Sequence, residues 1–175
     1  MKTLIIKKNK KGLGIYAIKS FKCGEKIYVL AGKIQTPKTL HYHGDNFKRG
    51  IIDPLQVGPD KYMELDKISI LFNHSCQPNA GIKGRSVLFA LKNIKKGEEI
   101  TYDYSTTIDE SFWCKCGSKK CRGVIYDFFT LSPIVQRRYF KFGALPGFLK
   151  VKYAKLISKK CPCGSGKKYK SCHGK

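Results

Sequence analysis

Acidic residues are scarce in this chain. Its 175 residues include 12 Asp and Glu against 35 Lys and Arg, which gives a formal net charge of +23. No acidic residue follows Asp127, whereas residues 128–175 hold twelve Lys and Arg. A cationic segment of this kind attracts polyanions, so it predicts contact with nucleic acid or a nucleoprotein. The alternative is a basic tail that only keeps the protein in solution.

Long apolar runs are also missing. No run approaches the roughly 18 residues that a membrane span requires, so no membrane partner is expected. The apolar stretch at residues 4–6 is too short for a secretory signal. We therefore expect an intracellular protein, cytoplasmic or, in a eukaryotic cell, nuclear and chromatin-associated. In a reducing compartment, closely spaced cysteines indicate metal binding, with disulfides as the alternative.

Seven of the eight cysteines fall into two groups with metal-ligand spacing. The first group consists of Cys76, Cys114, Cys116 and Cys121. The second consists of Cys161, Cys163, Cys172 and His173. Tetrahedral zinc takes four nitrogen or sulfur donors, and each group supplies four, so two Zn²⁺ sites are predicted. With both sites filled through thiolates, the net charge falls to about +20. Cys23 occupies a turn-like position and is predicted not to be a ligand.

Short apolar runs punctuated by glycine dominate the first 105 residues and predict strands. The expected strands lie at residues 4–6, 15–18, 27–30, 87–90 and 100–102. Residues 17–27 are repeated at residues 90–100, and both copies have a strand–turn–strand pattern. The polar, proline-containing segment 35–61 is expected to be a loop-rich insert.

Helices are expected only after this β-rich part. Ser132 and Pro133 are typical of a helix start, and Gly143 of its end. A second helix is predicted from Pro146 to about Ser158. The order of the elements indicates an α+β fold that is mainly β.

Three motifs carry chemical side chains. The first, Gly12-Leu13-Gly14, indicates either a plain turn or a close approach of the backbone to a small ligand. The second, NHSCQPN at residues 73–79, is too polar for an ordinary core segment. The third, GEEITYDY at residues 97–104, places Tyr102 and Tyr104 on one side of an expected strand, where they line either a core or a channel.

Together with CKCGSKKCRG at residues 114–123, these motifs show that residues 3–126 resemble the SET-domain protein lysine methyltransferases. The end of the chain, CPCGSGKKYKSCHGK, resembles a SEC-C zinc motif. The resemblance implies a SET-domain fold of small sheets with a knot-like active site. It also implies four parts: a SET domain at 3–108, a post-SET zinc flap at 112–126, a basic helical linker at 127–158 and a SEC-C zinc knuckle at 159–175.

The resemblance also assigns roles to residues. It implies that S-adenosylmethionine is held by Gly12, Leu13, Gly14, Asn73, His74 and Tyr104. It makes Tyr104 catalytic, and Tyr102 the residue that limits how many methyl groups are added. It makes Cys76, Cys114, Cys116 and Cys121 the ligands of the post-SET zinc. Where the family often has a tyrosine, this chain has Val29-Leu30, so that wall of the lysine channel is expected either to be missing or to be supplied from elsewhere, by Tyr28 or Tyr62.

The sequence thus predicts an S-adenosylmethionine-dependent protein-lysine N-methyltransferase. Its expected substrate is a lysine of a basic, nucleic-acid-associated protein, such as a histone, a histone-like protein or a ribosomal protein. The alternative is a catalytically weak SET-like binding module that is recruited to nucleoprotein. A zinc protein that reads nucleic acid sequence is disfavoured, since neither cysteine group has the spacing of a helical zinc finger. The SEC-C knuckle is expected to be a docking element, with a purely structural clip as the alternative.

Overall fold

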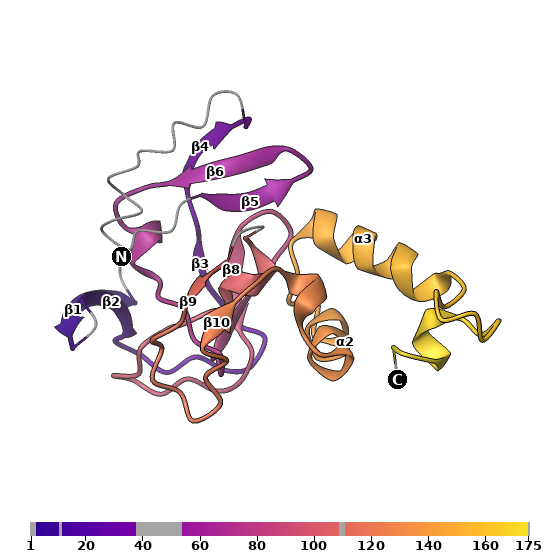
Figure 1. Ribbon diagram of the computed structural model, residues 1–175. Helices are drawn as coiled ribbons and strands as arrows, with labels where there is room; N and C mark the ends of the chain where they lie inside the picture. The colour runs from indigo at the N-terminus through magenta and orange to yellow at the C-terminus, as the bar shows by residue number, and fades with distance from the viewer. Residues whose placement is uncertain (1–2, 11, 38–53, 109–110, 175) are drawn as a thin grey trace.

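The computed structural model describes residues 3–10, 12–37, 54–108 and 111–174 (Figure 1). Small β-sheets make up one side of the molecule, and helices α2 (Pro133–Lys141) and α3 (Gly147–Ser158) lie along the other. The C-terminal segment extends beyond α3. The predicted mainly β, α+β architecture of small sheets is confirmed. Within the described ranges, no helix is long and apolar enough to cross a membrane.

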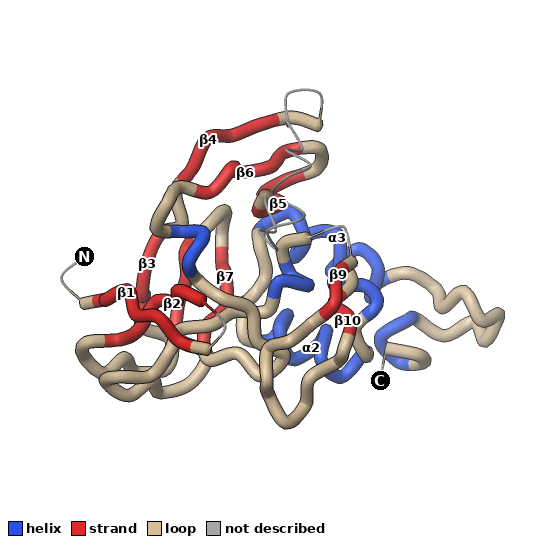
Figure 2. The backbone as a smooth tube through the Cα atoms, turned by 60° about the vertical axis from the view of Figure 1, so that its left-hand side comes forward, coloured by secondary structure: helices blue, strands red, loops and turns tan. Residues whose placement is uncertain are grey.

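The described strands form four small antiparallel sheets. In the first, β1 (Leu4–Asn9) pairs with β2 (Gly12–Ala17). The central sheet has the order β3 (Lys26–Val29), β8 (Val87–Ala90), β7 (Ala80–Lys83). The third has the order β4 (Gly32–Gln35), β6 (Lys61–Leu65), β5 (Leu55–Gly58), and lies at the top of Figures 1 and 2. The last pairs β9 (Phe112–Trp113) with β10 (Val124–Ile125).

The two copies of the internal repeat pair with each other. The Phe21 N–H donates to the Ile94 carbonyl at 2.8 Å, and the Ile94 N–H donates back to Phe21 at 2.9 Å. These residues occupy equivalent positions in the two copies, and both side chains are buried. Gly24 and Gly97, also equivalent, both have positive φ, at 84° and 89°. A local two-fold arrangement therefore joins the copies, and it brings the N-terminal strands against the segment that carries Tyr102 and Tyr104.

Two predictions of local structure are corrected. The described part of the insert at 35–61 is not loop-rich, because β5 and the start of β6 lie in it and pair as a hairpin. The turn residues of that hairpin, 58–60, are the glycine, proline and aspartate that suggested a loop, and Asp60 has a φ of 49°. Residues 38–53 of the insert lie outside the described residues.

The strand expected at 100–102 is also absent as a regular strand, because this segment changes partner from residue to residue. The Ile100 N–H donates to the Ile15 carbonyl at 2.8 Å, and the Tyr102 N–H donates to the Asn73 carbonyl at 3.2 Å. Isolated bridges form where a ladder was expected. The segment is thus held at a crossing point between β2 and the residues that follow Phe72.

The two helices form where the sequence predicts them. Pro133 occupies the first turn of α2, where a missing N–H costs no hydrogen bond, and Gly143 follows the helix with a φ of 65°. Both helices pack against β8 in one hydrophobic cluster. Its buried members are Phe89, Phe128, Leu131, Tyr139, Ala144, Leu145, Leu149 and Tyr153. Residues 127–158 therefore share a core with the sheets.

Candidate functional site

The two tyrosines of the third motif lie together at the crossing point. Their ring centroids are 4.8 Å apart, as the prediction of a common side requires. Tyr102 is buried, while Tyr104 begins the short 3-10 helix η2 (Tyr104–Thr106). The Tyr104 hydroxyl donates a hydrogen bond to the Phe72 carbonyl at 2.9 Å, which fixes the direction of the phenol.

Other aromatic rings surround this pair. The Tyr28 and Phe72 ring centroids are 5.3 Å apart. Tyr28, one of the two candidates for the missing channel wall, therefore lies next to Phe72, whose carbonyl accepts the hydrogen bond from Tyr104. The other, Tyr62, is buried in β6. The Phe112 and Tyr104 ring centroids are 6.1 Å apart. The sequence gave no signal for Phe112, because it stands in a strand of only two residues.

The first two motifs meet through a side-chain amide. Asn73 Nδ2 donates to the Leu13 carbonyl at 3.0 Å and to Glu99 Oε1 at 2.7 Å. A Cβ at Gly14 would lie only 2.9 Å from Asn73 Nδ2, so glycine allows the Asn73 amide to approach the backbone this closely. The structure thus brings together the predicted cofactor residues Leu13, Gly14 and Asn73. Glu99, which sequence reasoning did not single out, accepts a hydrogen bond from the Asn73 amide and so helps to hold it there.

The second asparagine of NHSCQPN has a structural role. Asn79 is buried, and its side-chain amide bonds to the backbone on both sides of Ile100. Nδ2 donates to the Glu99 carbonyl at 2.8 Å, and Oδ1 accepts from the Thr101 N–H at 2.9 Å. The side-chain amide of Asn79 therefore makes the hydrogen bonds that a neighbouring strand would make in a regular β-ladder.

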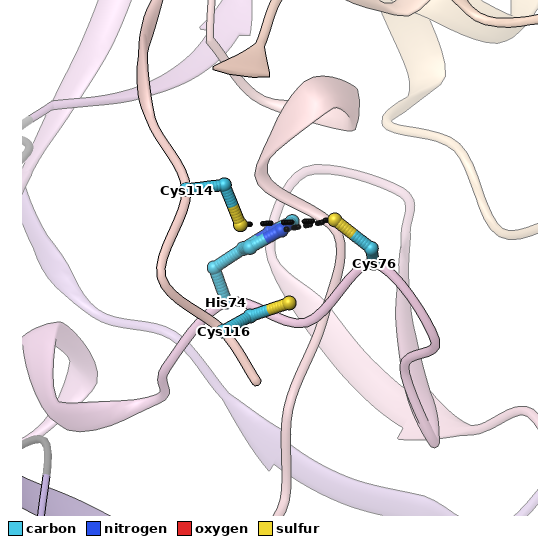
Figure 3. A group of neighbouring side chains, drawn as sticks. All are labelled: His74, Cys76, Cys114 and Cys116. Atoms are coloured by element: carbon cyan, nitrogen blue, oxygen red, sulfur yellow. Dashed lines mark hydrogen bonds between the residues drawn. The ribbon is translucent and has the colours of Figure 1, made fainter. Parts of the chain in front are cut away.

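Three of the predicted zinc ligands converge with His74 (Figure 3). The ligand atoms of His74, Cys76, Cys114 and Cys116 all lie within 4.8 Å of one another. Cys76 Sγ and Cys114 Sγ are 3.7 Å apart. Two thiolates that bind one tetrahedral Zn²⁺ at about 2.3 Å would be about 3.8 Å apart. The chemistry of the three thiols and the Cys76–Cys114 spacing therefore fit zinc.

Cys121, predicted as the fourth ligand, lies outside this group. Its Sγ is 3.6 Å from the Cys114 carbonyl, while His74 Nε2 is 3.3 Å from Cys76 Sγ. However, the Tyr104 N–H donates to His74 Nδ1 at 3.1 Å, so a neutral ring carries its proton on Nε2. That proton points to the sulfur of Cys76, and the ring then has no lone pair for a metal. Cys121 remains the predicted fourth ligand, and the His74 ring orients Cys76.

The thiols of this cluster differ in acidity. Burial raises the pKa of Cys76, and it raises the pKa of Cys114 well above its usual range. Burial also acts to raise the pKa of Cys116, but N–H donors from Cys76 and Ser118 outweigh it and lower the pKa to about 6. Without metal, Cys116 is thus the thiolate at neutral pH, while Cys76 and Cys114 keep their protons. Zinc binding must displace those protons.

The second predicted group also converges. The ligand atoms of Cys161, Cys163, Cys172 and His173 lie within 4.8 Å of one another. Cys161 Sγ is 3.1 Å from His173 Nδ1, and Cys163 Sγ is 3.5 Å from Cys172 Sγ. All eight cysteines are free, and Cys23 belongs to neither group. The structure therefore favours two metal-type clusters over the disulfide alternative.

A buried ion pair lies between the tyrosines and the first cysteine cluster. Asp103 is 2% exposed, and Arg122 Nη2 and Nη1 donate to its two oxygens at 2.6 Å and 2.9 Å. Burial by itself would lower the pKa of Arg122, but the hydrogen bonds that Arg122 donates to Asp103 outweigh it and raise the pKa above its usual value. Arg122 therefore stays charged and ties the segment after Cys121 to the residue before Tyr104.

Comparison with known proteins places these features in a family. The SET domain family matches residues 12–105, and the SEC-C motif matches residues 158–175. A search of curated proteins finds no matching relative. Among crystal structures, KRYPTONITE in complex with mCHG DNA and SAH is similar, with a TM-score of 0.55 and 21% identity over 70% of this chain. KRYPTONITE in complex with mCHH DNA, an H3(1-15) peptide and SAH gives a TM-score of 0.54, also at 21% identity over 70% of this chain.

This chain covers 29% of the length of either KRYPTONITE chain, and the likeness shows a common fold. The family match carries more weight, because it spans more than half of the 175 residues and contains all three motifs around the paired tyrosines. The chain belongs to the SET domain family and ends in a SEC-C motif.

Proposed function

We propose that this protein is an S-adenosylmethionine-dependent protein-lysine N-methyltransferase. The observation that carries the proposal is the meeting of three separate segments at one place: the start of β2 at residues 12–14, Asn73 and the Tyr102–Tyr104 pair. The two KRYPTONITE structures, which contain SAH, support it, since SAH is what remains of S-adenosylmethionine after the methyl group has left.

The residues present fit such a cofactor. A Cβ built at Gly12 would meet no atom within 4 Å, so the backbone is open there to a bound molecule. Tyr102 exchanges backbone hydrogen bonds with Asn73 and Ser75, which leaves the N–H and C=O of His74 on the opposite side of that segment. We therefore infer that the cofactor is bound by the backbone of residues 12–14, by Asn73 and by the main chain of His74. Bound there, S-adenosylmethionine would supply an electrophilic methyl group on its sulfonium.

The tyrosine pair would act on the substrate lysine. A free lysine amine has a pKa near 10.4 and is protonated at neutral pH, whereas the reaction needs the neutral amine. A channel walled by aromatic rings disfavours the charged form and excludes water. Because the Tyr104 hydroxyl donates its hydrogen to Phe72, its oxygen keeps lone pairs that can orient the amine or the methyl group. Tyr104 would thus align the reaction without acting as a strong base.

Zinc in the first cluster would hold this site together. Cys114 and Cys116 follow β9 directly, and Cys76 belongs to the segment that carries Asn73 and His74. A metal ion shared between them would fasten the segment that carries Phe112 beside the tyrosine pair. Here zinc would have a structural role.

We further propose that the substrate is a basic protein bound to nucleic acid. The cationic C-terminal segment repels a free basic protein, so recruitment needs phosphate groups. Lys152, Lys155 and Lys159 are exposed at intervals of three and four residues on α3 and its C-cap, which places them along one face. The complexes of KRYPTONITE with DNA, and in one case with a histone H3 peptide, are consistent with such a substrate.

A direct test is to incubate the full chain with isotope-labelled S-adenosylmethionine and a nucleoprotein extract, and to identify labelled lysines by mass spectrometry. Tyr104→Phe removes only the hydroxyl that donates to Phe72, and should abolish most of the label. Calorimetry should show that both proteins bind the methyl donor. If the wild-type protein binds the donor but labels no lysine in any extract, the methyltransferase proposal is wrong and the alternative of a SET-like binding module holds.

A further inference from the structure

Helix α2 contributes one side chain to the active-site segment. Tyr139, in its last turns, is 7% exposed, and its hydroxyl donates a hydrogen bond to Asp103 Oδ2 at 2.8 Å. The two residues are 36 positions apart in the chain. The contact therefore connects the C-terminal helices to the residue that immediately precedes Tyr104.

The Asp103 carboxylate caps the turn on which Tyr104 stands. Its Oδ1 accepts the Ser105 N–H at 3.1 Å, and its carbonyl accepts the Thr106 N–H at 3.1 Å. Tyr104 is the first residue of that turn, η2. Because a cap fixes the first backbone donors of a turn, the direction in which the Tyr104 ring leaves the backbone depends on where this carboxylate lies.

Four hydrogen bonds hold the carboxylate itself. Two come from Arg122, one from the Ser105 N–H and one from the Tyr139 hydroxyl. A carboxylate that is 2% exposed needs such donors to remain stable in the interior. Arg122 and Tyr139 both donate to Oδ2, from two different parts of the chain. Removing one of these donors should let the carboxylate move toward the remaining donor, and the cap of the turn should move with it.

We propose that Tyr139 is a positioning residue of the active site, which fixes the turn that carries Tyr104 through Asp103, so that α2 is an integral part of the catalytic unit. This inference rests on the proposed methyltransferase function. It also means that deleting residues 128–175 would damage the site, so a nucleic-acid role of the basic segment has to be tested by charge substitution.

A simpler explanation of the Tyr139–Asp103 contact is that any buried tyrosine hydroxyl needs a hydrogen-bond partner. Tyr153 argues against it. Its ring lies in the same hydrophobic cluster, in α3, and is 0% exposed. Among the described residues, its buried hydroxyl has no hydrogen-bond partner. This core thus tolerates a buried phenol without one, and Tyr153 provides a matched control for Tyr139.

The first measurement does not depend on activity. Tyr139→Phe and Tyr153→Phe are prepared in the full zinc-loaded chain, and ¹H–¹⁵N spectra of both are compared with the wild type. Both changes remove one oxygen and keep the ring, so both proteins should fold, which circular dichroism checks. We expect the Ser105 and Tyr104 amide resonances to shift in Tyr139→Phe and to stay in place in Tyr153→Phe. Unmoved resonances in Tyr139→Phe would overturn the proposal.

The second measurement is kinetic. We expect Tyr139→Phe to lower kcat about tenfold while the donor KM stays within about twofold, because the loss of one hydrogen bond to a charged group misplaces Tyr104 and leaves the cofactor site intact. Tyr153→Phe should keep the wild-type kcat. An unchanged kcat in Tyr139→Phe, or an equal loss in both variants, would refute a positioning role. An inactive wild-type protein would instead refute the proposed function, and the Ser105 resonance would still decide whether Tyr139 holds the turn.

Discussion

Replacing Arg122 by methionine should destabilise the protein more than the loss of any exposed charge. Methionine keeps much of the length and apolar volume of the side chain and removes the guanidinium. The change leaves the carboxylate of Asp103, which is 2% exposed, with the Ser105 N–H and the Tyr139 hydroxyl as its remaining hydrogen-bond donors among the described residues. The buried negative charge of Asp103 is then uncompensated. In the native protein, this carboxylate accepts two short hydrogen bonds from the planar guanidinium of Arg122.

The magnitude follows from the burial of the two partners. Removing one member of a fully buried ion pair costs about 3–5 kcal/mol. The Arg122 side chain is 27% exposed, so water reaches part of the pair, and we expect the lower end of that range, about 3 kcal/mol. For a chain of this size, such a loss lowers the melting temperature by about 6–12 °C. Arg85→Met provides the matched control, because Arg85 is exposed. It should change the free energy of unfolding by no more than about 0.5 kcal/mol.

Urea denaturation followed by circular dichroism, with zinc present, measures the free energy of unfolding of the three proteins. Zinc content has to be determined in parallel, because Cys121 is the neighbour of Arg122. If zinc is retained and Arg122→Met costs less than about 1 kcal/mol, the Asp103–Arg122 pair does not hold the site in the way described.

Two further predictions concern the metal and the partner. Zinc uptake by the apo protein at pH 7 should release at least two protons from the first cluster, because burial raises the pKa of Cys76 and Cys114. Zinc affinity should therefore fall as the pH is lowered, and titration calorimetry in buffers of different ionisation enthalpy would contradict this if it detected no proton release. Replacing three lysines of the α3 face by glutamate should weaken nucleic-acid binding and flatten its dependence on salt, as fluorescence anisotropy at several salt concentrations can measure. These lysines are Lys152, Lys155 and Lys159. The same change at three exposed lysines near the N-terminus, Lys7, Lys8 and Lys10, should have a smaller effect, and equal effects would argue against the α3 face.

Much of the fold could be predicted because its signals are local. Ser132 and Pro133 predict the start of α2, and the internal repeat is visible as matching residues in the sequence. The hairpin of β5 and β6 was missed for an equally local reason, since the residues of a tight turn resemble those of a loop. The strand expected near Ile100 failed because it depends on partners elsewhere in the chain, which an alternating pattern does not reveal.

By itself, the sequence determined which residues are predicted to carry chemistry: the glycines at 12 and 14, Asn73, the two tyrosines and the two cysteine groups, all recognisable from residue type and spacing. The tertiary structure alone decided how they are held. It turned the His74 ring toward Cys76, placed Phe112 beside Tyr104, and set Tyr139 of a distant helix against Asp103. Such contacts join segments far apart in the chain, and they form only because the α2–α3 core and the paired repeats bring those segments together in space.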